Sequence, residues 1–223
     1  MDNKLYVLII RRALHGEGGP KYGTKFDLDV ACEICGTGAK QVGPLLVKSS
    51  EIPKNKELVE TLDHEILFSE NFRHLFETQK VKGIHFIKVL NYKDNNPLDY
   101  WQLEPMFSLP PLDSESRGII TENQCPKCKK DGFFDTLKEK QQYVYATLEE
   151  TLLRSADMFT TWEHFGNSSR VEDPPNPPGV FKPRRIIHFA KPRIIVNEKV
   201  KKLFEEIKIK GVEFETVRVK EIL

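Results

Sequence analysis

Apolar and polar positions in the first part of the chain predict two strands of different character. Residues 4–10 form an almost continuous apolar run, which is typical of a buried strand. In residues 25–32, Phe26, Leu28 and Val30 alternate with acidic residues. This period of two predicts a half-buried strand that leads directly into the first two cysteines.

The clearest helix of the first half is expected over residues 69–83. Ser69 can cap its N-terminus, and Gly83 is a plausible stop. Residues 83–92 and 99–106 then predict two strands, adjacent across a turn that contains Asn-Asn-Pro. The face that the helix would bury carries Phe72, Leu75, Phe76 and Gln79.

Residues 148–166 are expected to be largely helical, because apolar residues recur there at helical spacing. Phe159, Trp162 and Phe165 follow that spacing, which usually marks a core face. An exposed Trp162 beside His164 would instead make a protein-binding patch. We favour the core interpretation.

The C-terminal segment, residues 193–219, predicts a strand, a helix and a second strand. Asn197 would cap the helix and Gly211 would stop it. In the last strand the apolar phase shifts between Phe214 and Val217, which indicates a bulge or a change of the buried face. The buried helix face is expected to carry Val200, Leu203, Phe204 and Ile207.

Strands and helices that do not alternate strictly indicate an α+β protein, with a mixed sheet and flanking helices. We expect a single domain over residues 1–223. It includes a zinc-knuckle pair from residues 29–39 and 122–132, which joins two distant segments, and a C-terminal strand-helix-strand unit over 186–220. Residues 142–148 predict one further strand.

Composition and charge narrow the function classes. The chain has 223 residues, 39% of them hydrophobic, and 34 basic residues nearly balance 33 acidic ones. A net charge of +1 argues against a dedicated nucleic-acid binder. The N-terminal apolar run is too short for a signal peptide, and no stretch is long enough to span a bilayer. We therefore expect a cytoplasmic protein with no membrane partner, its thiols kept reduced.

The four cysteines form two pairs of identical spacing and carry the strongest chemical signal. Cys32 and Cys35 are separated by two residues, as are Cys125 and Cys128, and 89 residues lie between the pairs. Each such turn presents two sulfurs to one ion, so the pairs together complete a tetrahedral four-thiolate shell for structural Zn²⁺. Lys129 stands where the first turn has Gly36, so the second turn must be strained or shaped differently.

Other chemistry of the cysteines is less well supported. A redox CxxC pair needs a helix N-terminus, but the first pair is followed by Gly-Thr-Gly. Catalytic zinc needs an open coordination position, which four cysteine ligands would close. Disulfides are disfavoured in a reducing compartment. A basic run at Lys127, Lys129 and Lys130 would offset the formal charge of about −2 on the zinc–thiolate centre.

No catalytic constellation is found elsewhere, so we do not expect an enzyme. Neither a Walker loop, nor a dinucleotide fingerprint, nor an esterase elbow occurs. We interpret residues 63–65, Asp-His-Glu, as solvated. We interpret residues 182–193 as a strand pair with basic ends in preference to a phosphate-binding patch. The six histidines form no recognised site: His15, His64, His74, His85, His164 and His188. The basic residues of 182–193 are Lys182, Arg184, Arg185, Lys191 and Arg193.

The layout resembles the double-CXXCG motif proteins, bacterial immunity proteins associated with contact-dependent or polymorphic toxins. The similarity rests on CEICG at residues 32–36, the second CxxC at 125–128, Asp-Met-Phe at 157–159 and the ending at 193–217. Lys129 departs from the pattern, which has glycine there.

The resemblance implies a small cytoplasmic protein that binds a cognate protein toxin and blocks it stoichiometrically, without catalysis. It implies that the four cysteines bind the metal, but it assigns no residue that contacts the toxin. An alternative is a zinc-ribbon protein that binds nucleic acid, although nucleic acid is not the partner we expect.

Overall fold

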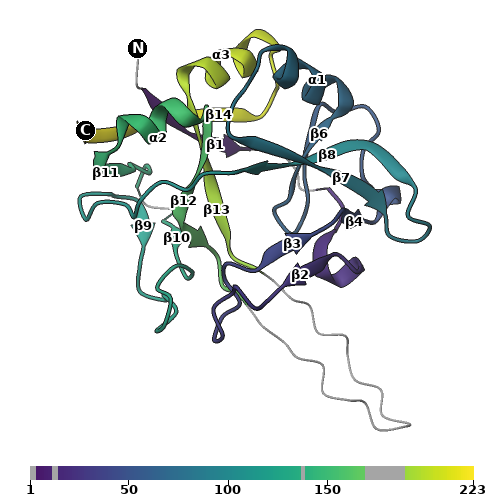
Figure 1. Cartoon of the computed structure of the whole chain (residues 1–223), viewed down its shortest axis with the longest axis horizontal. Coiled ribbons are helices and arrows are strands. Elements are labelled where there is room, and N and C mark those ends of the chain that lie inside the picture. The colour runs from purple at the N-terminus through teal and green to yellow at the C-terminus, as the bar shows by residue number, and fades with distance from the viewer. Residues whose placement is uncertain (1–3, 12–14, 137–138, 169–188) are drawn as a thin grey trace, which may run out of the picture.

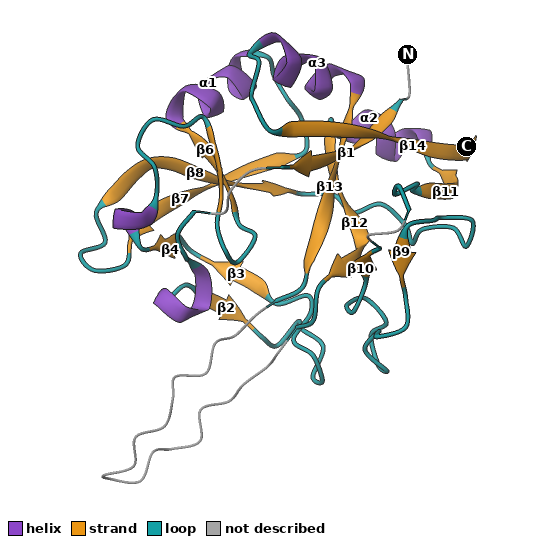
Figure 2. Cartoon of the chain, turned by 180° about the vertical axis from the view of Figure 1, so that it is seen from behind, coloured by secondary structure: helices purple, strands orange, loops and turns teal. Residues whose placement is uncertain are grey.

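The structure is a computed structural model that describes residues 4–11, 15–136, 139–168 and 189–223. Strands dominate it and helices are few, so the predicted mixed α+β class is confirmed (Figures 1 and 2). The described residues contain two five-stranded sheets and two short two-stranded ones. Two helices cover one side of the molecule, at the top of Figure 1.

The first five-stranded sheet joins the two ends of the chain. Its strand order is β11-β14-β1-β13-β12, and only the β11–β14 pair is parallel. Because β1 lies between the late strands β13 and β14, the sheet closes only when the N-terminus meets the C-terminal segment. The strands are β1 (Leu5–Ile10), β11 (Val144–Leu148), β12 (Met158–Phe165), β13 (Lys191–Asn197) and β14 (Val212–Ile222).

The continuous apolar run of β1 is explained by burial of both faces of this sheet. Leu5 and Val7 pack into one hydrophobic cluster, together with Tyr145 and Phe159. Tyr6 and Leu8 alternate with them and belong to a second cluster on the opposite face. A strand covered on both sides needs apolar residues at successive positions, so the predicted buried strand is confirmed.

Strand β14 changes its buried face, as the apolar phase shift predicts. Phe214 packs into the second cluster, whereas Val217 and Val219 pack into the first. Pairing with β1 runs without a register shift from Val212 to Val217, so no bulge is needed. Beyond Val217, the strand pairs with β11 instead.

The second five-stranded sheet has the order β4-β7-β8-β6-β5. Strands β7 and β8 form the predicted antiparallel pair, with Phe86 opposite Leu103. The second cluster also contains residues of this sheet, such as Phe68 and Leu103, so it fills the space between the two large sheets. The strands are β4 (Leu45–Val47), β5 (Leu58–Glu60), β6 (Ile66–Ser69), β7 (Ile84–Asn91) and β8 (Pro97–Pro105).

The two longer helices begin at the predicted caps. The Ser69 side chain accepts a hydrogen bond from the backbone N–H of Phe72, and the Asn197 side chain accepts one from Val200. The first helix ends at Thr78, earlier than predicted. Gly83 instead allows close packing, because a Cβ there would lie 2.2 Å from that of Ala156. The helices are α1 (Glu70–Thr78), α2 (Glu150–Ser155) and α3 (Glu198–Glu206), with 3-10 turns η1 (Gly19–Tyr22) and η2 (Ser49–Glu51).

The predicted helix over 148–166 is wrong for most of its length. Only α2 is helical, and β12 follows as a strand paired with β13. Phe159 and Phe165 are buried in the first cluster, while Trp162 is half-buried against it. Pairing with β13 overrides the local pattern, because spacings of three are compatible with a bulged strand, and this strand has a register shift between Thr160 and His164.

Two short hairpins complete the described fold, and both lie below the large sheets in the view of Figure 1. One pairs β2 (Lys25–Asp27) with β3 (Lys40–Val42), and the other pairs β9 (Ile119–Ile120) with β10 (Phe134–Asp135). The strand predicted over residues 25–32 is shorter than expected. It ends at Asp27, and Val30 is 63% exposed.

Candidate metal centre

The two cysteine turns adopt the same backbone conformation. In the first, the N–H of Gly36 donates to the carbonyl of Cys32 at 2.8 Å, with φ of 77° at Gly36. In the second, the N–H of Lys129 donates to the carbonyl of Cys125 at 3.1 Å, with φ of 59° at Lys129. The second turn is therefore strained and not differently shaped, because a non-glycine residue occupies the left-handed region.

The fold brings all four predicted cysteines together. Their sulfur atoms lie within 4.8 Å of one another. The Sγ atoms of Cys32 and Cys125 are 3.8 Å apart, and those of Cys35 and Cys128 are 3.5 Å apart. These separations are too long for a disulfide, in which the sulfurs lie at about 2.05 Å. All four thiols are free.

The sulfur spacing fits one tetrahedrally coordinated ion. With metal–sulfur distances of about 2.3 Å, a regular tetrahedron places its sulfurs about 3.8 Å apart. The two measured pairs, at 3.8 and 3.5 Å, are close to this value. Each close pair takes one sulfur from each turn, so an ion here would tie the two turns together. The four cysteines can therefore hold a metal ion.

The second turn is anchored by a buried carboxylate that the sequence analysis missed. Asp131, which is 5% exposed, accepts hydrogen bonds from the backbone N–H of Cys125 at 3.1 Å and from that of Ser168 at 3.4 Å. Gly132 follows it with φ of 84°, and a Cβ there would collide with the carbonyl of Asn123. Asp131 thus fixes where the sulfur of Cys125 lies. No spacing rule in the sequence marks this role.

Burial and hydrogen bonds shift the pKa values of three thiols in the cluster in different directions. Burial raises the pKa values of Cys35 and Cys128. Burial also acts to raise the pKa of Cys32, but backbone N–H groups of Cys35 and Ile34 outweigh it and lower the pKa to about 7. Four neighbouring thiolates would repel one another in a partly buried site, whereas a coordinated divalent ion deprotonates its thiols and compensates their charge.

The basic residues of the second turn have local partners. Lys127 forms an ion pair with Glu33 of the first turn. That contact raises the pKa of Lys127, and the neighbouring Cys32 and Cys125 contribute in the same direction. The ammonium of Lys130 lies 5.6 Å from the ring centre of Trp162 on β12. Both contacts join the second turn to other segments.

Outside the cysteines, the candidates from the sequence are scattered. His64 is exposed and lies 2.8 Å from Glu60, whereas the ring of His164 contacts the carbonyl of Ala190. Within the described ranges, the cysteines are the only group of three or more potential ligands placed to hold a metal ion. Two of the basic residues of 182–193 lie on β13 and form ion pairs. Lys191 pairs with Glu65, and Arg193 pairs with Asp135. Lys182, Arg184, Arg185 and His188 lie outside the described residues.

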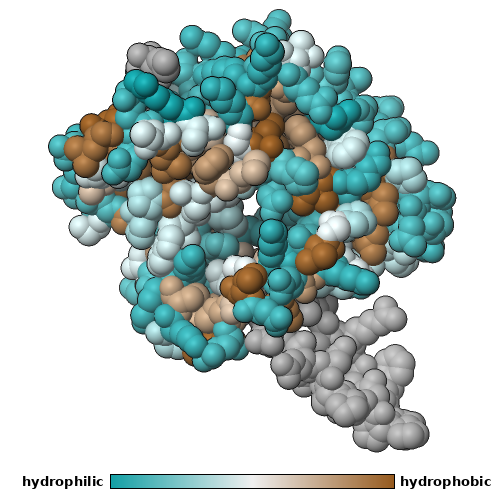
Figure 3. Space-filling view, in the orientation of Figure 1, coloured by the Kyte–Doolittle hydropathy of each residue, from teal (hydrophilic) through white to brown (hydrophobic). Residues whose placement is uncertain are grey.

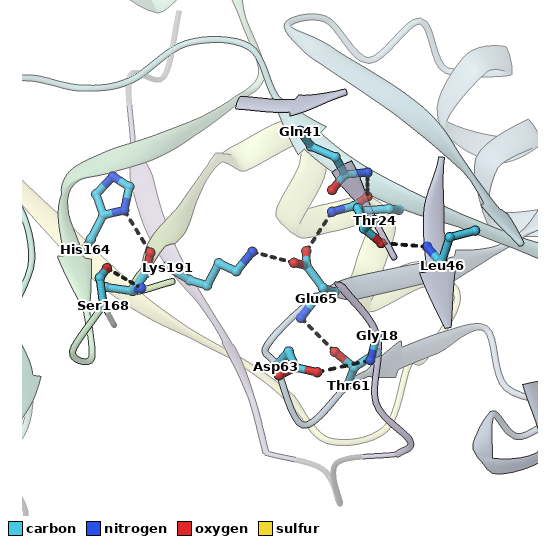
Figure 4. A network of polar contacts seen from close by, with 12 residues as sticks. Gly18, Thr24, Gln41, Leu46, Thr61, Asp63, Glu65, His164, Ser168 and Lys191 are labelled. Carbon is cyan, nitrogen blue, oxygen red and sulfur yellow. Dashed lines mark hydrogen bonds and ion pairs between the residues drawn. The ribbon is translucent and has the colours of Figure 1, made fainter. Parts of the chain in front are cut away.

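The interpretation of residues 63–65 as solvated is wrong for Glu65. This side chain is buried, and its carboxylate accepts a hydrogen bond from Gln102 of β8. It also accepts one from Lys191 of β13 (Figure 4). Its backbone N–H donates to the hydroxyl of Thr61. Burial of a glutamate is compatible with stability when its charge is paired in this way.

Comparison with known proteins adds no family assignment. No family model matches the chain, and no curated protein matches it. Across the described part of the chain, none of the helices has both the length and the apolar character required to cross a membrane.

Proposed function

We propose that this protein is an immunity protein that binds and neutralises a cognate bacterial toxin, with its fold held by a structural zinc ion. The resemblance of the cysteine layout and the C-terminal unit to the double-CXXCG proteins motivates the toxin assignment. The observation that carries the structural role of the metal is the sulfur cluster, in which two turns from distant segments contribute two sulfurs each.

Zinc is the ion we propose because four thiolates in tetrahedral spacing suit a soft, borderline cation. Cys32, Cys35, Cys125 and Cys128 would fill the coordination shell and leave no position for a substrate. In this proposal the metal is structural and the protein is not an enzyme. Free thiols in a metal-binding arrangement also support a reducing compartment, so we place the protein in the cytoplasm.

A structure that is already rigid before association suits a protein that acts by binding. Ordering a flexible surface at the moment of association weakens affinity, and a metal that fixes two distant segments beforehand removes part of that cost. The zinc would therefore contribute to toxin binding indirectly, by holding the chain in its binding conformation.

The toxin assignment is tested by co-expression with the product of the neighbouring toxin gene. We expect the wild-type chain to restore growth and to form a complex of fixed stoichiometry with the toxin. Cys125→Ser is expected to lose both. Cells that die despite soluble wild-type protein would refute the toxin assignment.

The zinc assignment is tested separately by elemental analysis of the purified chain. We expect one zinc per chain, and thiols that resist alkylation until a chelator is added. Reactive thiols in the zinc-loaded protein would contradict a closed site.

The nucleic-acid alternative is supported by the lysines of the second cysteine turn. Two of them already have protein partners, since Lys127 pairs with Glu33 and Lys130 lies over Trp162. Nucleic-acid binding would show as retention on heparin or DNA that weakens steeply with salt. Retention of that kind would favour this alternative over the toxin assignment.

A further inference from the structure

A cavity of about 360 Å³ lies between the two large sheets, and Lys130 of the second cysteine turn is among the residues that line it. Its walls come from β8, β12, β13 and the segment around β3. The face shown in Figure 3 is hollowed near its centre, between the two groups of strands. A volume of this size is within the range of small-molecule sites, about 300–1,000 Å³.

Aromatic rings form part of the cavity wall. Phe26 and Phe189 both line it and contact each other, with ring centres 4.9 Å apart. Trp162 and His164 line it from β12. Rings of this kind stack on a planar ligand, because its faces match theirs in shape and polarity.

A row of polar side chains with fixed orientations crosses the same cavity. Nε2 of Gln41 donates to the carbonyl of Gly43 and to Oε1 of Gln102, at 3.1 and 2.9 Å. Nε2 of Gln102 in turn donates to Glu65 at 2.6 Å. Lys191 donates to the same carboxylate (Figure 4). Since a carbonyl and a carboxylate can only accept, both amides are held in one orientation.

Gln102 keeps hydrogen-bonding capacity after these contacts. It is 7% exposed, and it uses one N–H proton on Glu65 and one acceptor position of Oε1 on Gln41. One proton and one acceptor position remain. A side-chain amide that offers both is the group that pairs bidentately with the N6–N7 edge of adenine.

His164 adds a second acceptor at the cavity. Its Nδ1 donates to the carbonyl of Ala190 at 3.0 Å, because that oxygen cannot donate. Burial lowers the pKa of His164, so the ring is neutral at physiological pH and its Nε2 is an acceptor. An exocyclic amino group has two N–H protons, and a site with two acceptors can use both.

We propose that this cavity binds the adenine base of a free nucleoside or nucleotide, stacked on Trp162 and paired with Gln102. Lys130 and Lys191 also line the cavity and would contact phosphate if the ligand carries one. Lys191 and Glu65 also line the neighbouring cavity of about 620 Å³. This proposal is independent of toxin binding and of the zinc.

The chain's two tryptophans provide a direct test. Trp162 lines this cavity, whereas Trp101 lies on β8 beside a different one, within cation–π distance of Arg73 and Lys88. We would titrate adenosine, AMP, guanosine and uridine into the zinc-loaded full chain and record tryptophan fluorescence. In Trp101→Phe the remaining fluorophore is Trp162, which lines the cavity. In Trp162→Phe it is Trp101, which lies outside the cavity.

We expect saturable quenching by adenosine in Trp101→Phe and none in Trp162→Phe. Guanosine and uridine should bind about tenfold more weakly or worse, as the loss of a bidentate base contact implies. If AMP binds more tightly than adenosine, the lysines contact its phosphate. If the two ligands bind equally, the protein recognises only the nucleoside part that they share. Both results support the site.

No saturation by adenosine or AMP at millimolar concentration would overturn the proposal, as would equal binding of all three nucleosides. Gln102→Met tests the pairing residue by isothermal titration with adenosine, and its melting curve shows whether it folds. Gln41→Leu is the second variant, because Gln41 is half-buried and orients Gln102. Folded Gln102→Met that binds adenosine at wild-type affinity would exclude the proposed pairing, whereas wild-type affinity in Gln41→Leu would show that Glu65 alone orients Gln102.

Discussion

The first five-stranded sheet and the pair of cysteine turns differ in regular structure and in how much apolar surface they bury. The sheet buries apolar side chains on both faces, and its central strand β1 is covered by two hydrophobic clusters. The cysteine turns have hardly any regular structure, and Val30 and Ile34 of the first turn are more than half exposed. The sheet is stabilised by burial, whereas the proposed function assigns the turns a metal ion held by their four sulfurs, so the two regions should respond differently to the same perturbation.

Removal of the metal is expected to have the largest effect. Cys125→Ser, or a chelator added to the wild type, should destabilise the protein by several kcal/mol, because metal binding in such sites is largely folding free energy. Thermal unfolding with and without chelator measures it. Glu33→Gln is the matched control on the first turn, since it removes the charge that pairs with Lys127 and leaves the four cysteines in place. A melting curve that neither chelator nor Cys125→Ser changes would contradict a structural metal.

Truncation of a side chain in the second hydrophobic cluster should also lower the free energy of unfolding, here through lost burial and not through lost metal binding. Phe204 of α3 is 2% exposed, and its ring contacts those of Phe68, Phe72, Phe76 and Phe214. Phe204→Ala is expected to cost about 3–5 kcal/mol through lost burial and a cavity.

Phe204→Ala also sharpens the contrast between the two regions. The variant should still bind metal with wild-type stoichiometry, and chelator should destabilise it further. Urea unfolding combined with elemental analysis measures both quantities. Loss of the metal in a folded Phe204→Ala protein would show that the two regions are coupled and not separately held.

The contrast also explains which features the sequence could predict. Local signals were sufficient where one segment determines its own structure: the caps at Ser69 and Asn197, and the apolar run of β1. The spacing of the cysteines was sufficient to predict that the four sulfurs lie together, because ligands of one ion can be recognised by residue type even when they are far apart in the sequence. In β14 the apolar phase shift revealed two buried faces, since each face has its own cluster.

Features that depend on a distant partner were not predictable where no motif in the sequence identifies that partner. Residues 158–165 are a strand because β13 pairs with them, although their aromatic spacing also suits a helix. Glu65 is buried because Lys191, 126 positions away, reaches it. Asp131 is an anchor only because two backbone N–H groups converge on it. Nothing in the neighbouring sequence reports any of these contacts.

Glu163, on β12, offers a pH-dependent test within the first five-stranded sheet. It is 2% exposed, one oxygen accepts from the N–H of Leu112, and Oε2 has no hydrogen-bond partner among the described residues. Burial raises its pKa above the ordinary value of 4.5, although the Leu112 contact acts in the opposite direction. A raised carboxyl pKa means that the contribution to stability is present at low pH and is lost as pH rises through the folded pKa.

Glu163→Gln cannot ionise, so it should avoid that loss. We expect the variant and the wild type to be similar near pH 4 and the variant to be more stable at pH 7, by on the order of 1 kcal/mol. Urea unfolding of both proteins at each pH measures the difference, and any effect of pH on metal binding cancels in the comparison. A difference that does not change with pH would rule out ionisation of Glu163 as its cause.

The smallest expected effect concerns the strain in the second cysteine turn. Lys129 has φ of 59°, where the equivalent position of the first turn is Gly36. Lys129→Gly removes the cost of about 1–2 kcal/mol that a non-glycine residue has in the left-handed conformation. Glycine is more flexible in the unfolded chain, which offsets about 0.5–1 kcal/mol of this gain. A net gain of about 0.5 kcal/mol is expected in the metal-loaded protein. Lys127→Gly, two residues earlier and without positive φ, should destabilise it instead. Equal responses at the two positions, measured by urea unfolding, would mean that the strain at Lys129 is not what distinguishes the turns.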